Sequence, residues 1–345
     1  MVFVTCRGGG LTVLDVSDPL AFCVARRWET QRPVEGQDRL GSTLVVVEMG
    51  GDGHGHRECT AALHVFDLSR ASRDLHPVAT IDLSSHVDGL LHVKLYTARD
   101  GRLWAICSGG FGRRVPGAVV AVDIHGDAHS TCVLPTPVRV PEGVGLVGDF
   151  AYIGGVGSTA MAVVDISDPM RMRLVSCEVK PGVGGGRGGL HLGGSQLVPA
   201  RSCLAGGNHI VQAVWGAYGG LAVLDVSQPA KPREVGRCVS ARTSFANRVT
   251  LDGGIALLPL ELPIGGGFAI VDVSNPTSPH RLCVVPIGFA LRDRRTYCLA
   301  LSHPKGADGS RFVHLFEAKA ARMLTYELHL PSSRQEAQQG AAAQI

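Results

Sequence analysis

A short aliphatic phrase followed by an acidic residue recurs along this 345-residue chain. The clearest copies end in Asp-x-Ser-x-Pro. They run from Leu11 to Pro19, Met161 to Pro169, Leu221 to Pro229 and Phe268 to Pro276. Shorter or degenerate copies run from Leu63 to Ser69, Val119 to Ile124 and Met323 to Pro331. The acidic position returns every roughly 40 to 60 residues, which is the spacing of β-propeller blades.

Each copy has the local sequence of a β-strand that ends in a tight turn. The aliphatic residues favour a strand, Asp and Ser hydrogen-bond the turn, and Pro fixes φ while removing a ladder donor. Further short apolar segments lie before and after each phrase, so each unit can supply four antiparallel strands. Such a sheet cannot bury both faces alone, but a ring of stacked sheets can bury them all.

We therefore predict an all-β fold, most simply a seven-bladed β-propeller with four-stranded antiparallel blades. The alternative is a ring of six blades with an extra hairpin, which would comprise residues Phe312 to Leu328. We expect one propeller domain over residues 1–331 and a disordered tail over residues 332–345, which is rich in Gln and Ala.

The phrase resembles the LVIVD repeat, and the resemblance extends from about Met1 to Pro331. The copies that carry it are those at Asp15, Asp67, Asp165, Asp225 and Asp272. The copy at Asp123 lacks the Ser-Asp-Pro turn, and the last copy has Glu327 and His329 where Asp and Ser are typical. The resemblance implies a β-propeller. It implies no reaction, because the repeat residues are structural.

The two ends of the repeat array are incomplete as blades. The first unit begins at Val2 with its second strand, and the last unit ends with its third strand near His329. Propellers commonly close by combining strands from both ends of the chain in one blade, because an open ring leaves strand edges unpaired. We expect roughly 20 further residues before Met1 to supply the missing strands.

Composition excludes several classes of protein. Charged residues are 18% and hydrophobic residues 45%, so the chain is not disordered as a whole. A net charge of +3 and an aromatic content of 5% argue against a nucleic-acid partner. No run of about 18 apolar residues predicts a membrane span, and the N-terminus lacks the pattern of a secretory signal. We expect a cytoplasmic protein whose ten cysteines are reduced and mostly buried.

The loops between second and third strands, and those between blades, should emerge together at one end of the ring. They are long and rich in arginine, whose planar fork suits carboxylate and phosphate groups. The candidate ligand-binding residues are Arg113, Arg114, Arg187, Arg292, Arg294 and Arg295. Other arginines of this end are Arg7, Arg32, Arg57, Arg139 and Arg242. Acidic residues in or near the same loops leave open an ordinary solvated surface, and they are Glu35, Asp52, Glu58, Asp88, Glu142, Asp293 and Glu317.

These features predict a binding or scaffold protein whose partner is a protein or an anionic small molecule. The alternative is an enzyme with a small-molecule or metal site at the mouth of the axial channel. Its candidate catalytic residues are His92, Glu142, His191 and Arg248, with a histidine or carboxylate as acid or base and Arg248 holding an anion. No metal or cofactor is assigned, because His54 and His56 lack a third ligand close in sequence and the inner-strand histidines do not share a register.

Overall fold

The computed structural model of the chain describes part of its length. The described residues are 1–5, 9–18, 21–50, 60–70, 75–110, 117–126, 129–138, 141–155, 160–179, 197–199, 208–214, 219–240, 246, 248–262, 265–286, 296–302, 311–317 and 322–328. The predicted tail, residues 332–345, lies outside them.

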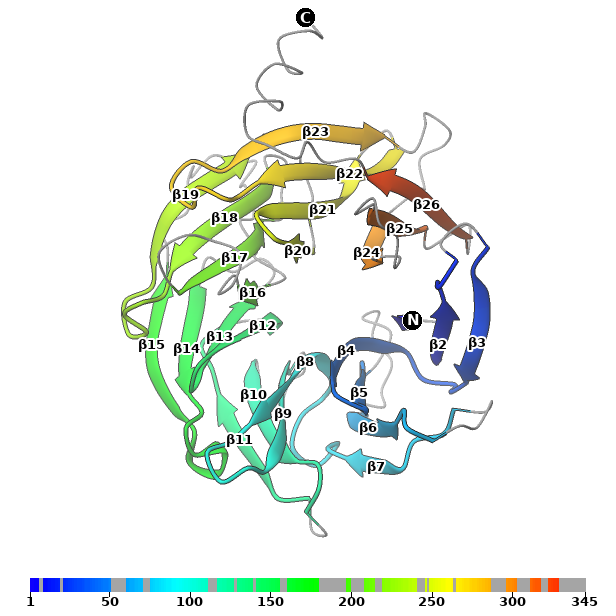
Figure 1. Cartoon of the computed structure of the whole chain (residues 1–345). Coiled ribbons are helices and arrows are strands. Elements are labelled where there is room, and N and C mark those ends of the chain that lie inside the picture. The colour runs from blue at the N-terminus through cyan, green and yellow to red at the C-terminus, as the bar shows by residue number, and fades with distance from the viewer. Residues whose placement is uncertain are drawn as a thin grey trace, which may run out of the picture.

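Within these residues the strands form seven antiparallel sheets, arranged radially around a common axis (Figure 1). Five sheets have four strands. The first contains β4 (Val34–Leu40), β5 (Thr43–Glu48), β6 (Ala62–Asp67) and β7 (Ala79–Asp82). The second contains β8 (Leu90–Thr97), β9 (Leu103–Gly109), β10 (Ala118–Asp123) and β11 (Thr131–Pro135). The third contains β12 (Pro141–Val147), β13 (Phe150–Gly155), β14 (Ala160–Asp165) and β15 (Arg173–Val179). The fourth contains β16 (Leu197–Pro199), β17 (His209–Val214), β18 (Gly220–Asp225) and β19 (Arg233–Val239). The fifth contains β20 (Thr250–Asp252), β21 (Ile255–Leu262), β22 (Gly265–Asp272) and β23 (His280–Pro286).

Two sheets have only three strands each. One consists of β1 (Val2–Thr5), β2 (Leu11–Asp15) and β3 (Cys23–Trp28), and the other of β24 (Thr296–Ser302), β25 (Arg311–Glu317) and β26 (Arg322–Leu328). The predicted all-β propeller with antiparallel four-stranded blades is confirmed. The prediction of seven four-stranded blades is wrong, and the structure supports the six blades of the alternative interpretation, with five four-stranded sheets among the described residues. The hairpin of the alternative interpretation is β25 with β26, and β24 pairs with it as a third strand.

Helical structure among the described residues is limited to a single 3₁₀ turn, η1 (Pro169–Arg171), which follows the phrase at Asp165. No helix in this part of the chain is long and apolar enough to cross a bilayer.

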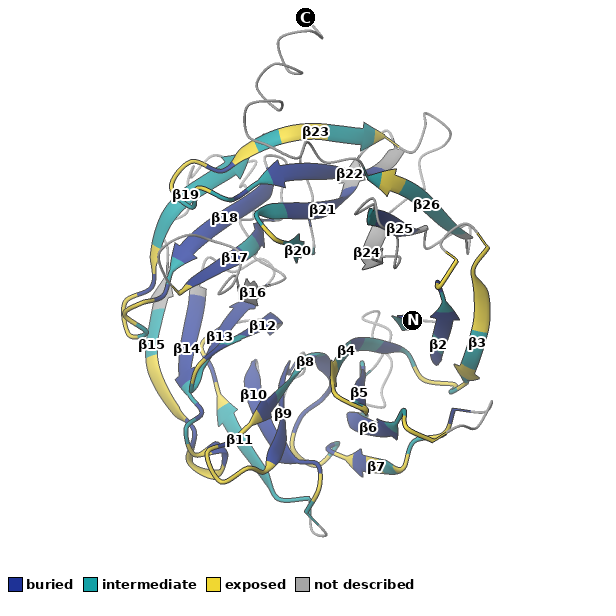
Figure 2. Ribbon diagram, viewed as in Figure 1, coloured by how far each residue is buried: buried dark blue, intermediate teal, exposed yellow. Residues whose placement is uncertain are grey.

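The apolar core lies between neighbouring sheets. One cluster joins Val65 of β6 to Val93 of β8 and Val120 of β10, and another joins Trp104 of β9 to Ile153 of β13. Figure 2 shows the consequence, because the middle strands of the complete sheets are mostly buried and the outermost strands are exposed or half-buried. Each sheet therefore depends on its neighbours to remove its faces from water.

The two three-stranded sheets contact each other through apolar side chains. Val2, Leu14 and Val16 form a small buried cluster, and Met323 of β26 packs against it. This contact brings the first and last sheets of the chain together on one side of the ring (Figure 1).

The acidic residue of the repeat organises the turn that follows the third strand. The Asp225 Oδ1 atom accepts a hydrogen bond from the Ser227 backbone N–H at 2.9 Å, and this bond lowers the pKa of Asp225. The other carboxylate oxygen faces the start of the fourth strand, where the Arg233 guanidinium lies 3.8 Å away. Asp165 makes the same two contacts, with Ser167 at 3.0 Å and Arg173 at 2.8 Å. One carboxylate thus joins the turn to the next strand.

A β-bulge in the outermost strand accompanies the complete turn. The pairing register between the strand that carries the repeat aspartate and the strand after it shifts in four sheets, at Val13/Leu14, Val163/Val164, Val223/Leu224 and Ile270/Val271. All four shifts lie one or two residues before an aspartate that begins Asp-x-Ser-x-Pro. The pairs β6 with β7 and β10 with β11, which lack that turn, show no shift. Because a bulge increases local strand twist, it bends the outermost strand around the ring.

The prediction that the cysteines are mostly buried is wrong for Cys23 and Cys283, which are exposed. Cys107 is buried, and Cys132, Cys177 and Cys238 are half-buried. Cys23 pairs with Asp15 at the start of its strand, whereas the half-buried Cys238 pairs with Leu221 near the end. All six are free thiols.

Replacing Asp225 by alanine should lower the free energy of unfolding by about 1–2 kcal/mol, because the turn loses a charge-assisted hydrogen bond. Chemical denaturation at neutral pH measures this difference. Because the folded state lowers the pKa of Asp225, its contribution should be present above the unfolded pKa of about 3.9 and disappear as the pH falls through the lowered value. Gln228→Ala, in the exposed part of the same turn, is the control and should change stability little. Equal effects of the two substitutions would contradict this role for Asp225.

Candidate functional site

The innermost strands of the ring share an irregularity near their first residues. The pairing register shifts at Val34/Gln37 in β4, Leu90/His92 in β8, Pro141/Gly143 in β12 and Thr296/Cys298 in β24. These strands begin where the connections from preceding sheets arrive, so the bulges lie toward the loop-bearing end of the axis. A bulge redirects a side chain that regular pairing would place against a neighbouring sheet.

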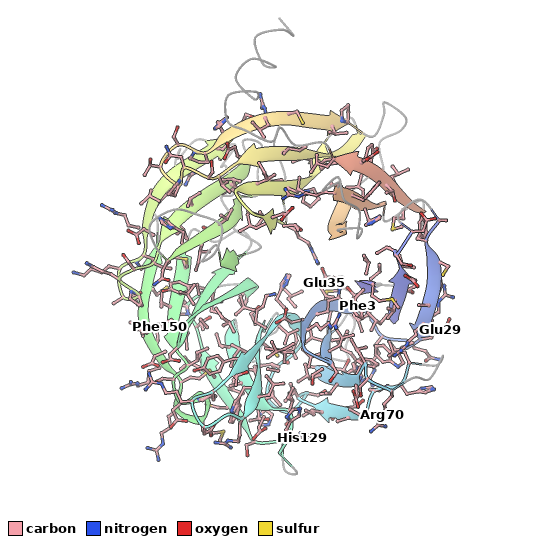
Figure 3. The ribbon with its side chains drawn as sticks, in the orientation of Figure 1. Phe3, Glu29, Glu35, Arg70, His129 and Phe150 are labelled. Carbon is pink, nitrogen blue, oxygen red and sulfur yellow. The ribbon has the colours of Figure 1, made fainter. Side chains whose placement is uncertain are left out.

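Three polar residues come together near the bulges of β4 and β8, and we call them the axial cluster: Glu35 in β4, His92 in β8 and Arg248 just before β20. The Arg248 guanidinium donates to Glu35 Oε1 at 2.9 Å, although the residues are 213 positions apart. The side chains of Glu35 and Arg248 are only 11% and 24% exposed. Figure 3 labels Glu35 at the inner edge of the ring.

The backbone around Glu35 is held by the neighbouring strands. The Thr5 hydroxyl donates to the Glu35 carbonyl oxygen at 2.8 Å. Gly36 allows β4 to approach β8 closely, since a Cβ atom there would lie 2.4 Å from the Leu91 carbonyl oxygen and 2.7 Å from His92 Cα. A glycine at this position therefore places the backbones of Glu35 and His92 side by side.

A second ion pair joins β4 to β8 of the neighbouring sheet. Lys94 Nζ donates to Asp38 Oδ1 at 2.9 Å, and the Leu95 backbone N–H donates to Asp38 Oδ2 at 2.8 Å. The two inner strands are thus fixed relative to each other on both sides of His92.

The environment of His92 keeps its imidazole neutral. Burial lowers the pKa of His92 to about 3, and the positive charges of Arg248 and Lys94 act in the same direction, while Glu35 opposes them. A general base works best with a pKa near the working pH. At neutral pH His92 is therefore suited to hydrogen bonding and poorly suited to proton transfer.

Only some of the sequence-predicted site residues are described. His92 and Arg248 do come together. Glu142 lies at the bulge of β12, and nothing is described of its side chain. His191 lies outside the described residues, as do the predicted ligand-binding residues Arg113, Arg114, Arg187, Arg292, Arg294 and Arg295.

Glu35 is the residue of the axial cluster that sequence reasoning missed as a site residue. The sequence analysis placed it among the loop acids. An alignment of the inner strands by their pairing register places Gly36 at the position of His92 and Arg248. Glu35 is the residue next to Gly36, so such an alignment could have indicated that it lies near the axis. Its pairing with Arg248 had no sequence signal.

Arg32, a member of the predicted loop arginines, is used inside the fold. Its guanidinium lies 3.2 Å from Glu48 Oε2, and Glu48 Oε1 lies 3.0 Å from His64 Nε2. The other His64 nitrogen contacts the Thr80 hydroxyl at 3.0 Å, and the Trp28 ring lies 4.6 Å away. Burial raises the pKa of Glu48, but hydrogen bonds and charge from His64 and Arg32 outweigh it and leave the pKa lowered. These contacts offset the cost of burying the Glu48 carboxylate between two sheets.

No metal centre is evident in the part of the chain that the structure describes, since no three His, Cys, Asp or Glu side chains gather there. A metal site that involves His191 or the Gly51–His56 loop concerns residues outside that part.

Comparison with known proteins identifies the repeat. The LVIVD repeat matches residues 2–30, 142–177, 207–240 and 264–282. These four regions belong to the four sheets that have both the complete Asp-x-Ser-x-Pro turn and the outermost-strand bulge. The sheets of β4–β7, β8–β11 and β24–β26 lie outside these matches. Their sequences lack the complete Asp-x-Ser-x-Pro turn.

Solved structures show the same architecture at low identity. The WD40 domain of coronin from Toxoplasma gondii is 13% identical, with a TM-score of 0.58 over 95% of this chain and 78% of that one. A hypothetical selenium-binding protein from Sulfolobus tokodaii is 10% identical, with a TM-score of 0.58 over 81% of this chain and 74% of that one. These similarities concern the propeller fold alone. No curated protein sequence matches the chain significantly.

Substitutions in the axial cluster should move the pKa of His92 in opposite directions. Arg248→Met removes a positive neighbour and should raise the pKa, whereas Glu35→Gln removes a negative neighbour and should lower it further. Imidazole NMR signals followed against pH measure both changes. Shifts of the same sign in the two variants would contradict the assigned geometry.

The lowered pKa of His92 also predicts a pH dependence of stability. Unfolded histidine binds a proton below about 6.5, while folded His92 resists protonation until about pH 3. The free energy of unfolding should therefore fall as the pH drops below 6.5. Denaturation of His92→Gln over this range should give a shallower slope, while the exposed-residue control His76→Gln should follow the wild type.

Proposed function

We propose that this chain, a β-propeller built on LVIVD repeats, is a binding protein that receives a small anionic ligand at the loop-bearing end of its axis. The observation that carries the proposal is the axial cluster, in which Arg248 is brought to Glu35 and His92 from another sheet. The ligand class is a carboxylate or phosphate, which matches the planar fork of arginine.

Energetics support a binding role for the Arg248–Glu35 pair. Removing two charges from water costs free energy that their attraction often fails to recover, so a buried pair is a poor device for stability alone. The inner strands elsewhere use apolar side chains, such as Val93 and Val144, which pack into the inter-sheet core. A charged cluster at the axis is therefore better explained by a ligand than by packing.

In the structure, the Glu35 carboxylate accepts the Arg248 hydrogen bond that the anionic group of a ligand would accept. An incoming carboxylate or phosphate can share the guanidinium with Glu35 or replace it, since the fork offers several N–H donors. The neutral imidazole of His92 can supply a further hydrogen bond without adding charge. Arginines of the surrounding loops would raise the local concentration of anions.

Binding is favoured over acid–base catalysis by the chemistry of His92. A pKa of about 3 makes His92 a weak base at neutral pH, and Arg248 stays protonated throughout. The cluster thus offers hydrogen bonds and the guanidinium of Arg248, whose charge becomes available to an anion that shares or replaces Glu35.

Titration with succinate and with inorganic phosphate tests the proposal. Either probe should shift the imidazole NMR signals of His92, because it binds Arg248, whose charge acts on that ring. Arg248→Met should weaken binding by about tenfold or more, since it removes a charge-assisted pair of hydrogen bonds. Arg248→Lys keeps the charge without the fork and should bind with intermediate affinity.

Lys231→Met is the matched control. Lys231 is exposed in the turn between β18 and β19 and is not part of the axial cluster. This variant should keep near-wild-type affinity, and circular dichroism verifies that each variant is folded. The proposal fails if neither probe affects His92, or if folded Arg248→Met binds as tightly as the wild type.

A further inference from the structure

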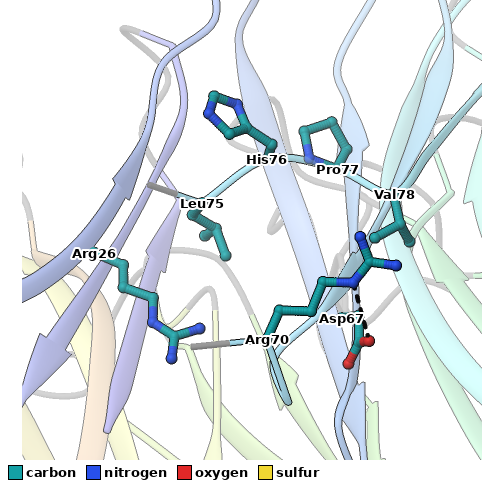
Figure 4. Close-up of a pocket in the computed structure, with 7 residues that line it drawn as sticks. All are labelled: Arg26, Asp67, Arg70, Leu75, His76, Pro77 and Val78. Carbon is teal, nitrogen blue, oxygen red and sulfur yellow. Dashed lines mark ion pairs between the residues drawn. The ribbon is translucent and has the colours of Figure 1, made fainter. Parts of the chain in front are cut away.

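A pocket of about 170 Å³ lies between the first sheet of the chain and the sheet of β4–β7, away from the axial cluster. Figure 4 shows the guanidinium of Arg26 directed into it from β3. The second side of the pocket comes from the connection between β6 and β7. Its lining residues are Arg26, Asp67, Arg70, Leu75, His76, Pro77 and Val78.

Comparison of the repeats within the chain shows that Arg26 is out of pattern. Arg26 pairs with Val13, two residues before the repeat aspartate. The corresponding residues of the other complete repeats are small, and they are Ser176, Gly236 and Cys283. Arg26 lies on the same face of β3 as Trp28, which packs against the neighbouring sheet. A long cationic side chain thus enters a junction that is otherwise closely packed.

The equivalent junction at Gly236 shows why small residues are usual there. A Cβ atom on Gly236 would lie 2.1 Å from the Pro276 carbonyl oxygen and 2.7 Å from Pro279 Cδ, both in the turn of the next sheet. The connection between β6 and β7 is longer than that turn and lacks its Asp-x-Ser-x-Pro sequence. At this junction the β6–β7 connection lines a pocket, whereas the turn at Pro276 and Pro279 contacts Gly236 directly.

The charges around the pocket do not balance. Arg70 lies 3.4 Å from Asp67, and Asp67 also accepts hydrogen bonds from Ser69. No hydrogen bond or ion pair of Arg26 is found among the residues that the structure describes, although its side chain is half-buried. Among the described residues, the junction therefore carries one positive charge without an identified partner, that of Arg26, beside an apolar wall of Leu75, Pro77 and Val78.

We propose that this pocket is a second, independent binding site for a single oxyanion group, a phosphate or carboxylate, held by the Arg26 guanidinium with Arg70 beside it. The volume accommodates one such group with bound water. The apolar wall leaves room for the organic part of a ligand that bears the anion. This site is separate from the axial cluster in residues and in place.

Chemical modification of arginine by phenylglyoxal, mapped by mass spectrometry in the intact folded chain, tests the proposal. Inorganic phosphate should slow modification of Arg26 by about tenfold relative to chloride at equal ionic strength, since the bound anion occupies the guanidinium. Arg27, the next residue on the same strand, is the internal control. It is exposed and paired with Glu29 at 3.6 Å, and its modification should change little.

Acetate distinguishes the source of the anion. Protection by phosphate alone indicates a phosphate-bearing ligand, and equal protection by acetate indicates a carboxylate. Equilibrium dialysis of phosphate against Arg26→Gln should show the loss of one class of sites, while Arg27→Gln retains it. Arg248→Met should not affect protection of Arg26, so failure at the axis and failure here are distinguishable. The inference is overturned if Arg26 is modified equally fast with and without phosphate, or if Arg26 and Arg27 slow together.

Discussion

Where the structure describes their side chains, the sheets of this protein are apolar on both faces, and that constraint determines the arrangement of the rest. A sheet with two apolar faces needs a neighbour on each side, and a closed ring satisfies this for all sheets at once. The core consequently lies between sheets, as the cluster of Val65, Val93 and Val120 shows. The same arrangement places the first strand of each complete sheet at the axis. Glu35 and Arg248, which are distant in sequence, meet there.

Repetition within the chain separates structural residues from functional ones without any second sequence. The aspartate, serine and following cation recur with the same hydrogen bonds, as at Asp165 and Asp225, so their role is to form the turn and the bulge. Arg26 has no counterpart at the corresponding positions. Glu35 likewise lies within a bulge of an inner strand, and the corresponding bulges of β12 and β24 include glycine and cysteine. Departures from the repeat therefore coincide with both proposed binding sites.

The sequence allowed the fold to be predicted because the turn chemistry is local. Asp-x-Ser-x-Pro ends a strand wherever it occurs, and the third strands were placed correctly at Asp15, Asp165, Asp225 and Asp272. Residues whose role depends on strand register were not predictable in this way. The position of Cys23 differs from that of Cys238 because their pairing partners differ. The Glu35–Arg248 pair and the pocket at Arg26 depend on contacts between sheets, which no local pattern encodes.

The long separation of Glu35 and Arg248 has a consequence for the order of folding. Closing a loop of 213 residues costs conformational entropy of about 5 kcal/mol, while a partly exposed ion pair returns about 1 kcal/mol or less. The pair therefore cannot initiate ring closure and forms only after the intervening sheets have stacked. On the ribosome, Glu35 emerges long before Arg248 is synthesised. Until then Glu35 lacks its arginine partner, and the inner strands β20 and β24 are synthesised only after Arg248.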